Sequence, residues 1–160
     1  MTTDPPALLG VYLNDHLAGS TAGVGLAGRL AAAEGDWAPE LRRIATEIGE
    51  DRRTLLELMD RLNVPAKRYK TALAWLGEKA ARLKPNLRFM SRSPLSRVIE
   101  LETMRLGVEG KAAGWRTLRE VAETEARLDT ERLDALLNRA LQQAEDLERL
   151  RVRAVTEALA

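Results

Sequence analysis

Apolar residues recur every three or four positions along most of this 160-residue chain, a spacing that places them on one face of an α-helix. The pattern predicts helices over residues 7–34, 38–62, 66–83, 94–123 and 130–159, and the motifs Gly35-Asp36 and Asn63-Val64-Pro65 mark two of the turns. Four of these helices have roughly 25–30 residues and would be about 40–45 Å long. We therefore predict an all-α fold in which residues 1–160 form a single helical-bundle domain.

The predicted helix over 94–123 has apolar residues on both sides of one narrow charged stripe, so we expect it to be buried on most of its circumference. The two apolar sides consist of Leu95, Ile99, Leu106 and Ala113, and of Leu101, Met104, Val108, Ala112 and Trp115. Opposite the charged stripe lie Gly107, Gly110 and Gly114. Each glycine costs a helix about 0.5–1 kcal/mol relative to alanine, so we expect another backbone to approach closely here. Ser93 and Pro94 predict the start of this helix.

Composition excludes several kinds of chemistry. The chain has no cysteine, so disulfides, thiolate catalysis and cysteine-ligated metals are excluded. The sequence MTTDPP lacks the features of a signal peptide, and no apolar stretch reaches the roughly 20 residues that span a bilayer. We expect a soluble, cytoplasmic protein. The first predicted helix is rich in glycine, and a break near Gly19–Gly25 would fit that composition.

Positive charge is concentrated in one part of a chain whose formal net charge is only +1. Residues 67–97 contain nine basic residues and one acid, and the candidates for anion binding are Lys67, Arg68, Lys70, Arg88 and Arg92. The alternative is that these cations neutralise acidic faces of neighbouring helices. No nucleic-acid-binding motif accompanies them, so we do not expect a nucleic-acid partner.

The lengths and spacing of the helices resemble those of ferritin-like four-helix bundles, with an extra short helix in the connection between helices 2 and 3. The stretches LLGVYLNDHLAG and LSRVIELETMRLGVEGK are also similar to an uncharacterised family of high-GC, actinobacterial-type bacteria. Catalytic ferritin-like proteins carry an inward acid on helices one and three and Glu-x-x-His on helices two and four. Here His16 replaces the first acid, Glu50 is followed by Arg53, and Glu145 is followed by Glu148. The resemblance therefore implies a degenerate di-iron motif.

Three polar residues lie where a plain scaffold would have apolar ones. His16 is the only histidine and falls on the apolar face of its helix, where we favour a core histidine over a ligand or an acid–base group. Asp51 lies at the edge of the apolar stripe of 38–62 and is either a salt-bridge partner or half of a polar pocket. Glu100 faces away from the charged stripe and is either solvated or a buried carboxylate. In an up-and-down bundle these residues lie near one end, whereas a lengthwise connection puts Glu100 about 20 Å from His16.

Three functional hypotheses follow. The first is a non-enzymatic bundle without a cofactor. It would form a homo-oligomer such as a dimer and act on a protein or small-anion partner through its surface or a small internal pocket. The second is a metal-binding bundle in which His16, Asp51 and Glu100 are the candidate ligands. The third is an anion-binding module built on residues 67–97. No phosphate-binding loop, serine–histidine–aspartate set or His-Glu-x-x-His motif is present in the sequence.

Overall fold

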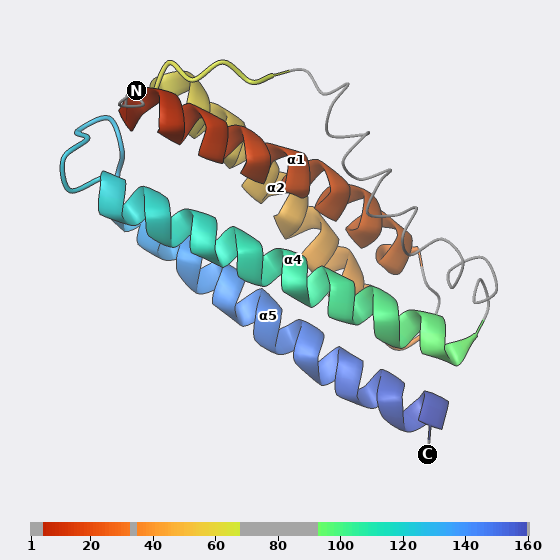
Figure 1. Cartoon of the computed structure of the whole chain (residues 1–160). Helices are drawn as coiled ribbons and strands as arrows, with labels where there is room; N and C mark the ends of the chain where they lie inside the picture. The colour runs from red at the N-terminus through yellow and green to blue at the C-terminus, as the bar shows by residue number, and fades with distance from the viewer. Residues whose placement is uncertain (1–4, 33–34, 68–92, 160) are drawn as a thin grey trace.

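The computed structural model describes residues 5–32, 35–67 and 93–159. Four long helices account for almost all of them: α1 (Pro5–Ala31), α2 (Ala38–Arg61), α4 (Pro94–Val121) and α5 (Thr130–Leu159) (Figure 1). No strand occurs in the described ranges, so the predicted all-α class is confirmed. The last three helices begin at the residues that the sequence predicts. The break near Gly19–Gly25 that the glycine content would allow does not occur, because α1 is continuous through all of its glycines.

The predicted short helix over 66–83 lies mostly outside the described residues. Ala66 and Lys67 are described, and neither is helical.

Local capping explains where two of the long helices begin. The Ser93 hydroxyl accepts a hydrogen bond from the backbone N–H of Leu95 at 3.2 Å, and an Asp129 carboxylate oxygen accepts one from the N–H of Glu131 at 3.0 Å. Both side chains satisfy backbone donors that have no partner within the helix.

Side-chain contacts establish the direction of each helix. Between α4 and α5, Arg119 pairs with Asp134 at 3.1 Å near one end of the bundle and Arg151 pairs with Glu102 at 3.4 Å near the other, so these helices are antiparallel. Between α1 and α4, the Tyr12 hydroxyl lies 2.9 Å from that of Thr117.

The opposite end of α1 meets the beginning of α4. A Cβ built on Gly23 would lie 3.8 Å from Met104 Cε, so α1 and α4 are also antiparallel. Because α1 and α2 form a hairpin, α2 and α4 point the same way (Figure 1). Lys67 and Ser93 therefore lie at opposite ends of the bundle.

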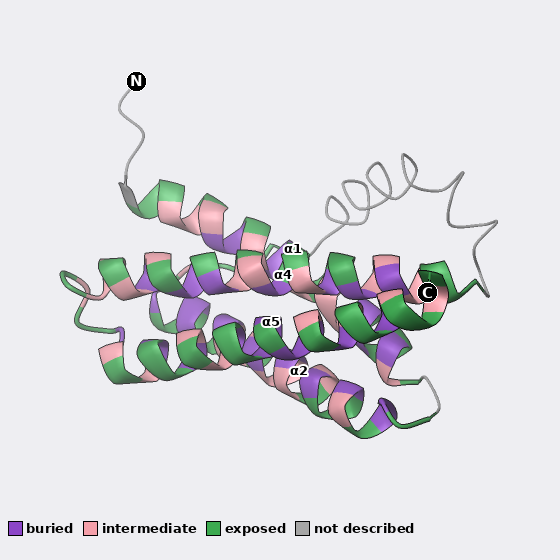
Figure 2. Cartoon of the chain, turned by 90° about the horizontal axis from the view of Figure 1, so that it is seen from below, coloured by how far each residue is buried: buried purple, intermediate pink, exposed green. Residues whose placement is uncertain are grey.

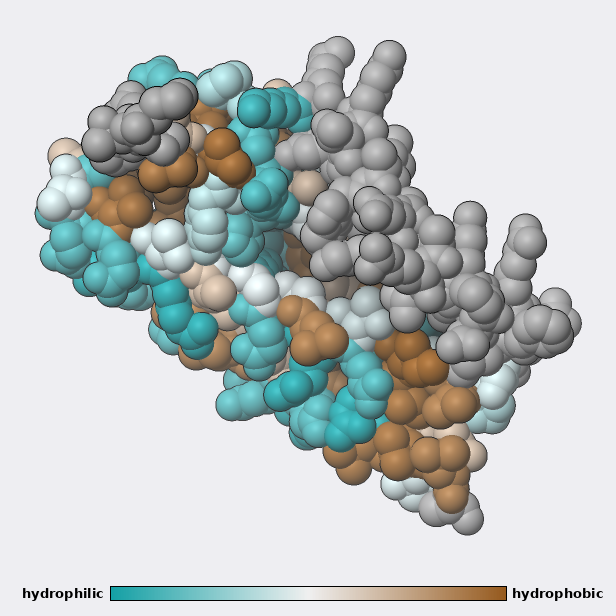
Figure 3. Space-filling view, viewed as in Figure 1, coloured by the Kyte–Doolittle hydropathy of each residue, from teal (hydrophilic) through white to brown (hydrophobic). Residues whose placement is uncertain are grey.

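The core is formed by one face of each helix. Figure 2 shows the buried residues on the inward faces and the exposed residues outside. Of the two apolar sides predicted for 94–123, the one containing Leu101, Met104 and Val108 is buried. The other is not, since Leu106 is 69% exposed. The reason is geometric: α4 has close neighbours on fewer sides than the sequence suggested. Apolar side chains also gather on the surface over the beginning of α1 and where α4 begins and α5 ends (Figure 3).

Polar side chains join α2 to residues 132–149 of α5, in an arrangement that we call the α2–α5 ladder. Its rungs are Glu40–Arg149, Arg43–Asp146, Glu47–Gln143, Glu50–Arg139, Asp51–Arg139 and Glu57–Arg132. Each step moves a few residues forward in α2 and back in α5, so the two helices are antiparallel.

The pKa of the Asp146 carboxyl is subject to two opposing effects. Burial raises this pKa, but the hydrogen bonds from Gln142, Arg43 and Arg149 outweigh the effect of burial and hold the pKa below its ordinary value.

Candidate functional site

A pocket of about 400 Å³ lies between α1, α2 and α4. Its volume falls in the range of about 300–1,000 Å³ that is typical of small-molecule sites. Most of its wall is apolar, with Leu13, Ile48, Leu55, Met104 and Leu118 among the lining residues. Glycines of α1 and α4 leave room for the cavity: a Cβ built on Gly19 or Gly110 would meet no atom within 4 Å. The expectation that another backbone approaches the glycine strip of α4 is therefore wrong, because much of this strip borders open space.

A buried charge cluster forms one part of the pocket wall. Asp51 is only 2% exposed, and it accepts hydrogen bonds from the Lys111 ammonium and from the Arg139 guanidinium. Lys111 also donates to the side-chain oxygen of Gln143, which is 0% exposed. The Gln143 amide in turn donates to Glu47 at 2.8 Å.

The protonation of Lys111 depends on its burial and on its pairing with Asp51. Burial lowers the pKa of the Lys111 ammonium, and the charge and hydrogen bond of Asp51 oppose this shift without cancelling it. An unpaired charge at this depth would be costly. Asp51 is therefore both a salt-bridge partner and part of a polar pocket, which were the two alternatives for this residue.

His16 forms another part of the wall. Its ring lies against Tyr12, with the ring centroids 4.5 Å apart, and covers Gly114, where a Cβ would be only 3.0 Å from the imidazole Nδ1. Burial lowers the pKa of His16, and the nearby charge of Asp15 raises it by less. A lowered pKa favours the neutral form of the imidazole at pH 7. No side chain or backbone group in the described part of the chain is hydrogen-bonded to its nitrogens.

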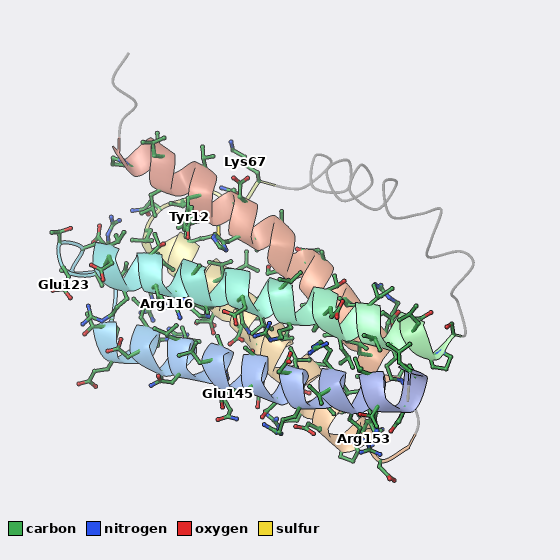
Figure 4. The ribbon with its side chains drawn as sticks, turned by 60° about the horizontal axis from the view of Figure 1, so that its bottom comes forward. Tyr12, Lys67, Arg116, Glu123, Glu145 and Arg153 are labelled. Atoms are coloured by element: carbon green, nitrogen blue, oxygen red, sulfur yellow. The ribbon has the colours of Figure 1, made fainter. Side chains whose placement is uncertain are left out.

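Trp115 and Tyr12 also line the pocket and carry polar groups. Trp115 is 3% exposed, and its indole N–H has no hydrogen-bond partner among the described residues. Tyr12 extends from α1 toward α4 (Figure 4), and its hydroxyl is already paired with Thr117. Among the described lining residues, His16 and Asp15 have no hydrogen-bond partner, and Arg52 donates only to the neutral hydroxyl of Thr21. An arrangement of this kind can bind and orient a small molecule.

The structure brings two of the three candidate ligands together and separates the third. His16 and Asp51 line the same pocket, whereas Glu100 is not part of its wall. Glu100 precedes Gly114, the residue that His16 covers, by fourteen residues of α4. At 1.5 Å per residue these two positions are about 21 Å apart along the helix. Within residues 5–32, 35–67 and 93–159, no group of three or more histidine, cysteine or acidic residues is placed to hold a metal ion.

The positions that correspond to di-iron ligands are occupied in other ways. Glu50 pairs with Arg139 at 3.1 Å in the α2–α5 ladder, and Glu145 is exposed and points away from the bundle (Figure 4). Of the anion-binding candidates, Lys67 is exposed, and its backbone N–H donates to Asn14 at 2.8 Å. Arg68, Lys70, Arg88 and Arg92 lie outside the described residues.

Sequence reasoning missed Lys111 and Gln143. A usable signal existed for Lys111, since it lies four residues after Gly107 and three before Gly114 and so shares their face of α4. Gln143 similarly lies between Ala140 and Leu147 in the apolar seam of α5. What the sequence could not show is their pairing, because Lys111 and Asp51 are distant along the chain and meet only through packing.

Comparisons of the chain with family models, with curated proteins and with solved structures give no match. None of the described helices has an apolar stretch long enough to cross a membrane. The site geometry is therefore the basis for a functional proposal.

Proposed function

We propose that this chain is a non-enzymatic four-helix bundle that binds a small organic molecule in the pocket between α1, α2 and α4. The observation that carries the proposal is the pocket itself: a cavity of about 400 Å³ with apolar walls and a few polar groups, which is the usual composition of a ligand site. The acid and the cations that would be candidates for catalysis are instead engaged with one another. Asp51 holds Lys111 and Arg139.

We further propose a ferritin-like architecture without a standard di-iron centre, in a cytoplasmic protein that forms a homodimer. Two antiparallel helix pairs in which α2 and α4 point the same way support this architecture, because the same arrangement is expected for a bundle with one lengthwise connection. Sedimentation velocity tests the dimer, which would appear at twice the monomer mass of 17.7 kDa.

Filling the pocket tests the proposed function. Gly19 lines the cavity and a Cβ there would meet no atom within 4 Å, so the side chain of Gly19→Leu should occupy ligand space. Gly28 lies on the same helix, is equally free of neighbours and does not line the pocket, which makes Gly28→Leu a matched control. Binding of naphthalene derivatives is measured by calorimetry.

We expect the wild type and Gly28→Leu to bind at least one derivative with equal affinity, and Gly19→Leu to bind it at least tenfold more weakly. The proposal is wrong if no derivative binds the wild type, or if both leucine variants retain the wild-type affinity.

A further inference from the structure

One cation in the wall of the pocket has no acid partner among the described residues. Arg52 is half-buried and lines the pocket from α2, and its one hydrogen bond within the described ranges runs from Nε to the neutral hydroxyl of Thr21, at 3.2 Å. The other strong cation of the wall, Lys111, is already paired with Asp51. An anion that enters the pocket would therefore find an unmatched counter-charge at Arg52.

The sequence around Arg52 explains why this charge has no partner. An acid of the same helix would have to lie three or four residues away to pair with it. The positions at those distances hold Ile48, Gly49, Leu55 and Leu56. Arg52 contacts α1 through Thr21, and residues 16–31 of that helix contain no acid either. The chain thus places a cation beside the pocket in surroundings that supply no carboxylate.

Thr21 holds the guanidinium of Arg52 in one orientation. The Thr21 hydroxyl donates to the backbone carbonyl of Leu17 at 3.0 Å and accepts from Arg52 Nε. The two terminal nitrogens of Arg52, Nη1 and Nη2, have no hydrogen-bond partner in the described part of the chain. A guanidinium fork of this kind can bind a carboxylate through two parallel hydrogen bonds. Because Arg52 is already held by Thr21, it loses less conformational freedom when it binds such a group.

Asp15 is the acid of the wall that has no ion pair among the described residues, and it does not favour a cationic ligand to the same degree. This residue is exposed, so water solvates its carboxylate and pairing it with a cation would gain little. Asp15 precedes Thr21 by six residues of α1, or about 9 Å along the helix at 1.5 Å per residue. An anion bound at Arg52 would thus be kept apart from Asp15.

From these observations we infer the class of ligand: a molecule with an apolar body and a single carboxylate, which pairs with the guanidinium of Arg52. The apolar body would contact Leu13, Ile48 and Met104 in the rest of the wall. A group with two negative charges, such as a phosphate, would leave one charge unmatched, because Lys111 is held by Asp51. The inference rests on the proposed function, since it specifies what the same pocket binds.

Four probes with one ring system separate charge from shape: 2-naphthoate, its uncharged analogue 2-acetylnaphthalene, 2-naphthyl phosphate and 2-naphthylmethylammonium. Their dissociation constants are measured by calorimetry at pH 7.5 and low salt. We expect the carboxylate to bind the wild type at least about tenfold more tightly than the ketone and than either of the other ions. This preference should decrease when salt is added, because Arg52 is only half-buried and its charge is partly screened.

Variants of Arg52 test whether this side chain causes the preference. Arg52→Met should abolish the preference for the carboxylate over the ketone while leaving the affinity for the ketone unchanged. Arg52→Lys keeps the charge without the fork and should retain part of the preference. Arg53→Met is the matched control, because the neighbouring arginine is exposed and does not line the pocket, so this variant should behave as the wild type.

The possible outcomes distinguish the inference from the proposed function on which it rests. Equal affinity for the carboxylate and the ketone, tightest binding of any other probe, or a preference for the carboxylate that survives in Arg52→Met overturns the inference while leaving the proposed function intact. Failure of all four probes to bind the wild type overturns the proposed function.

Discussion

Replacing Asp51 with asparagine should destabilise the protein strongly. The carboxylate is buried and accepts hydrogen bonds from two cations, Lys111 and Arg139. Arg139 keeps Glu50 as a partner at 3.1 Å, whereas Lys111 is left with the uncharged Gln143. Removing one member of a buried ion pair typically costs about 3–5 kcal/mol, because the other charge stays desolvated. For a domain of this size that loss corresponds to a Tm lower by roughly 6–20 °C.

The assay is a double-mutant cycle in which the free energy of unfolding of each variant is measured by urea denaturation, monitored by circular dichroism. Asp51→Asn and Lys111→Met are measured alone and together, and the double variant should be more stable than the sum of the single losses predicts, by about 1–3 kcal/mol. Asp134→Asn is the matched control. Its carboxylate pairs with Arg119 at 3.1 Å but is 55% exposed, so its removal should have a much smaller effect.

Raising the pH provides a further check on the same reasoning. Burial already lowers the pKa of Lys111, and Asp51 opposes that shift. Without Asp51 the pKa should fall further, so Lys111 can lose its proton at a lower pH and the destabilisation of Asp51→Asn should shrink as the pH rises. The reasoning is refuted if Asp51→Asn costs no more than Asp134→Asn, or if the losses of the two single variants simply add.

Three more predictions concern the pocket and the ladder. Gly114→Ala should be about 1 kcal/mol less stable than Gly110→Ala in urea unfolding. The new Cβ at position 114 would lie 3.0 Å from His16 Nδ1, whereas a Cβ at position 110 would meet no atom within 4 Å. Equal stabilities of the two variants would contradict this prediction. NMR titration should give His16 a pKa below its ordinary value of 6.5, and Asp15→Asn should lower it further. Since the unfolded chain then binds a proton more readily than the folded one, stability should decrease as the pH falls below about 6.5, and a His16 pKa above 6.5 would refute the burial argument. Asp146→Asn should lower the free energy of unfolding by about 1.5–3 kcal/mol at pH 7. Because the pKa of Asp146 is lowered in the folded state, the difference in stability from the wild type should shrink as the pH falls below about 3.9. A difference in stability that persists unchanged at pH 2 would contradict this prediction.

The helices were predictable from the sequence because each long segment repeats its apolar residues at helical spacing. The α5 helix runs from Thr130 to Leu159, as that pattern predicts. Burial around α4 was less predictable. Its apolar residues occupy two arcs, and nothing local distinguishes the arc of Leu101, which is buried, from that of Leu106, which is exposed.

The candidate site was only partly predictable for a related reason. His16 and Asp51 stand out because each is polar on an apolar face, and both line the pocket. Lys111 did not stand out, because a lysine on a helix is normally solvated and its partner Asp51 belongs to another helix. The position of Glu100 depended on the direction of α4, which follows from how the helices pack and not from the spacing of residues within any one of them.

One rung of the α2–α5 ladder has its charges reversed, and this asymmetry opposes sliding of the two helices. In the other ion pairs of the ladder the acid belongs to α2 and the cation to α5, whereas Arg43 and Asp146 exchange these roles. If α5 moved by one turn along α2, Arg43 would face Arg149 and Asp146 would face Glu47, so like charges would meet. A ladder with every acid on α2 would lose far less from the same shift. The reversed Arg43–Asp146 pair therefore favours one alignment of α2 with α5 over alignments shifted by a helical turn.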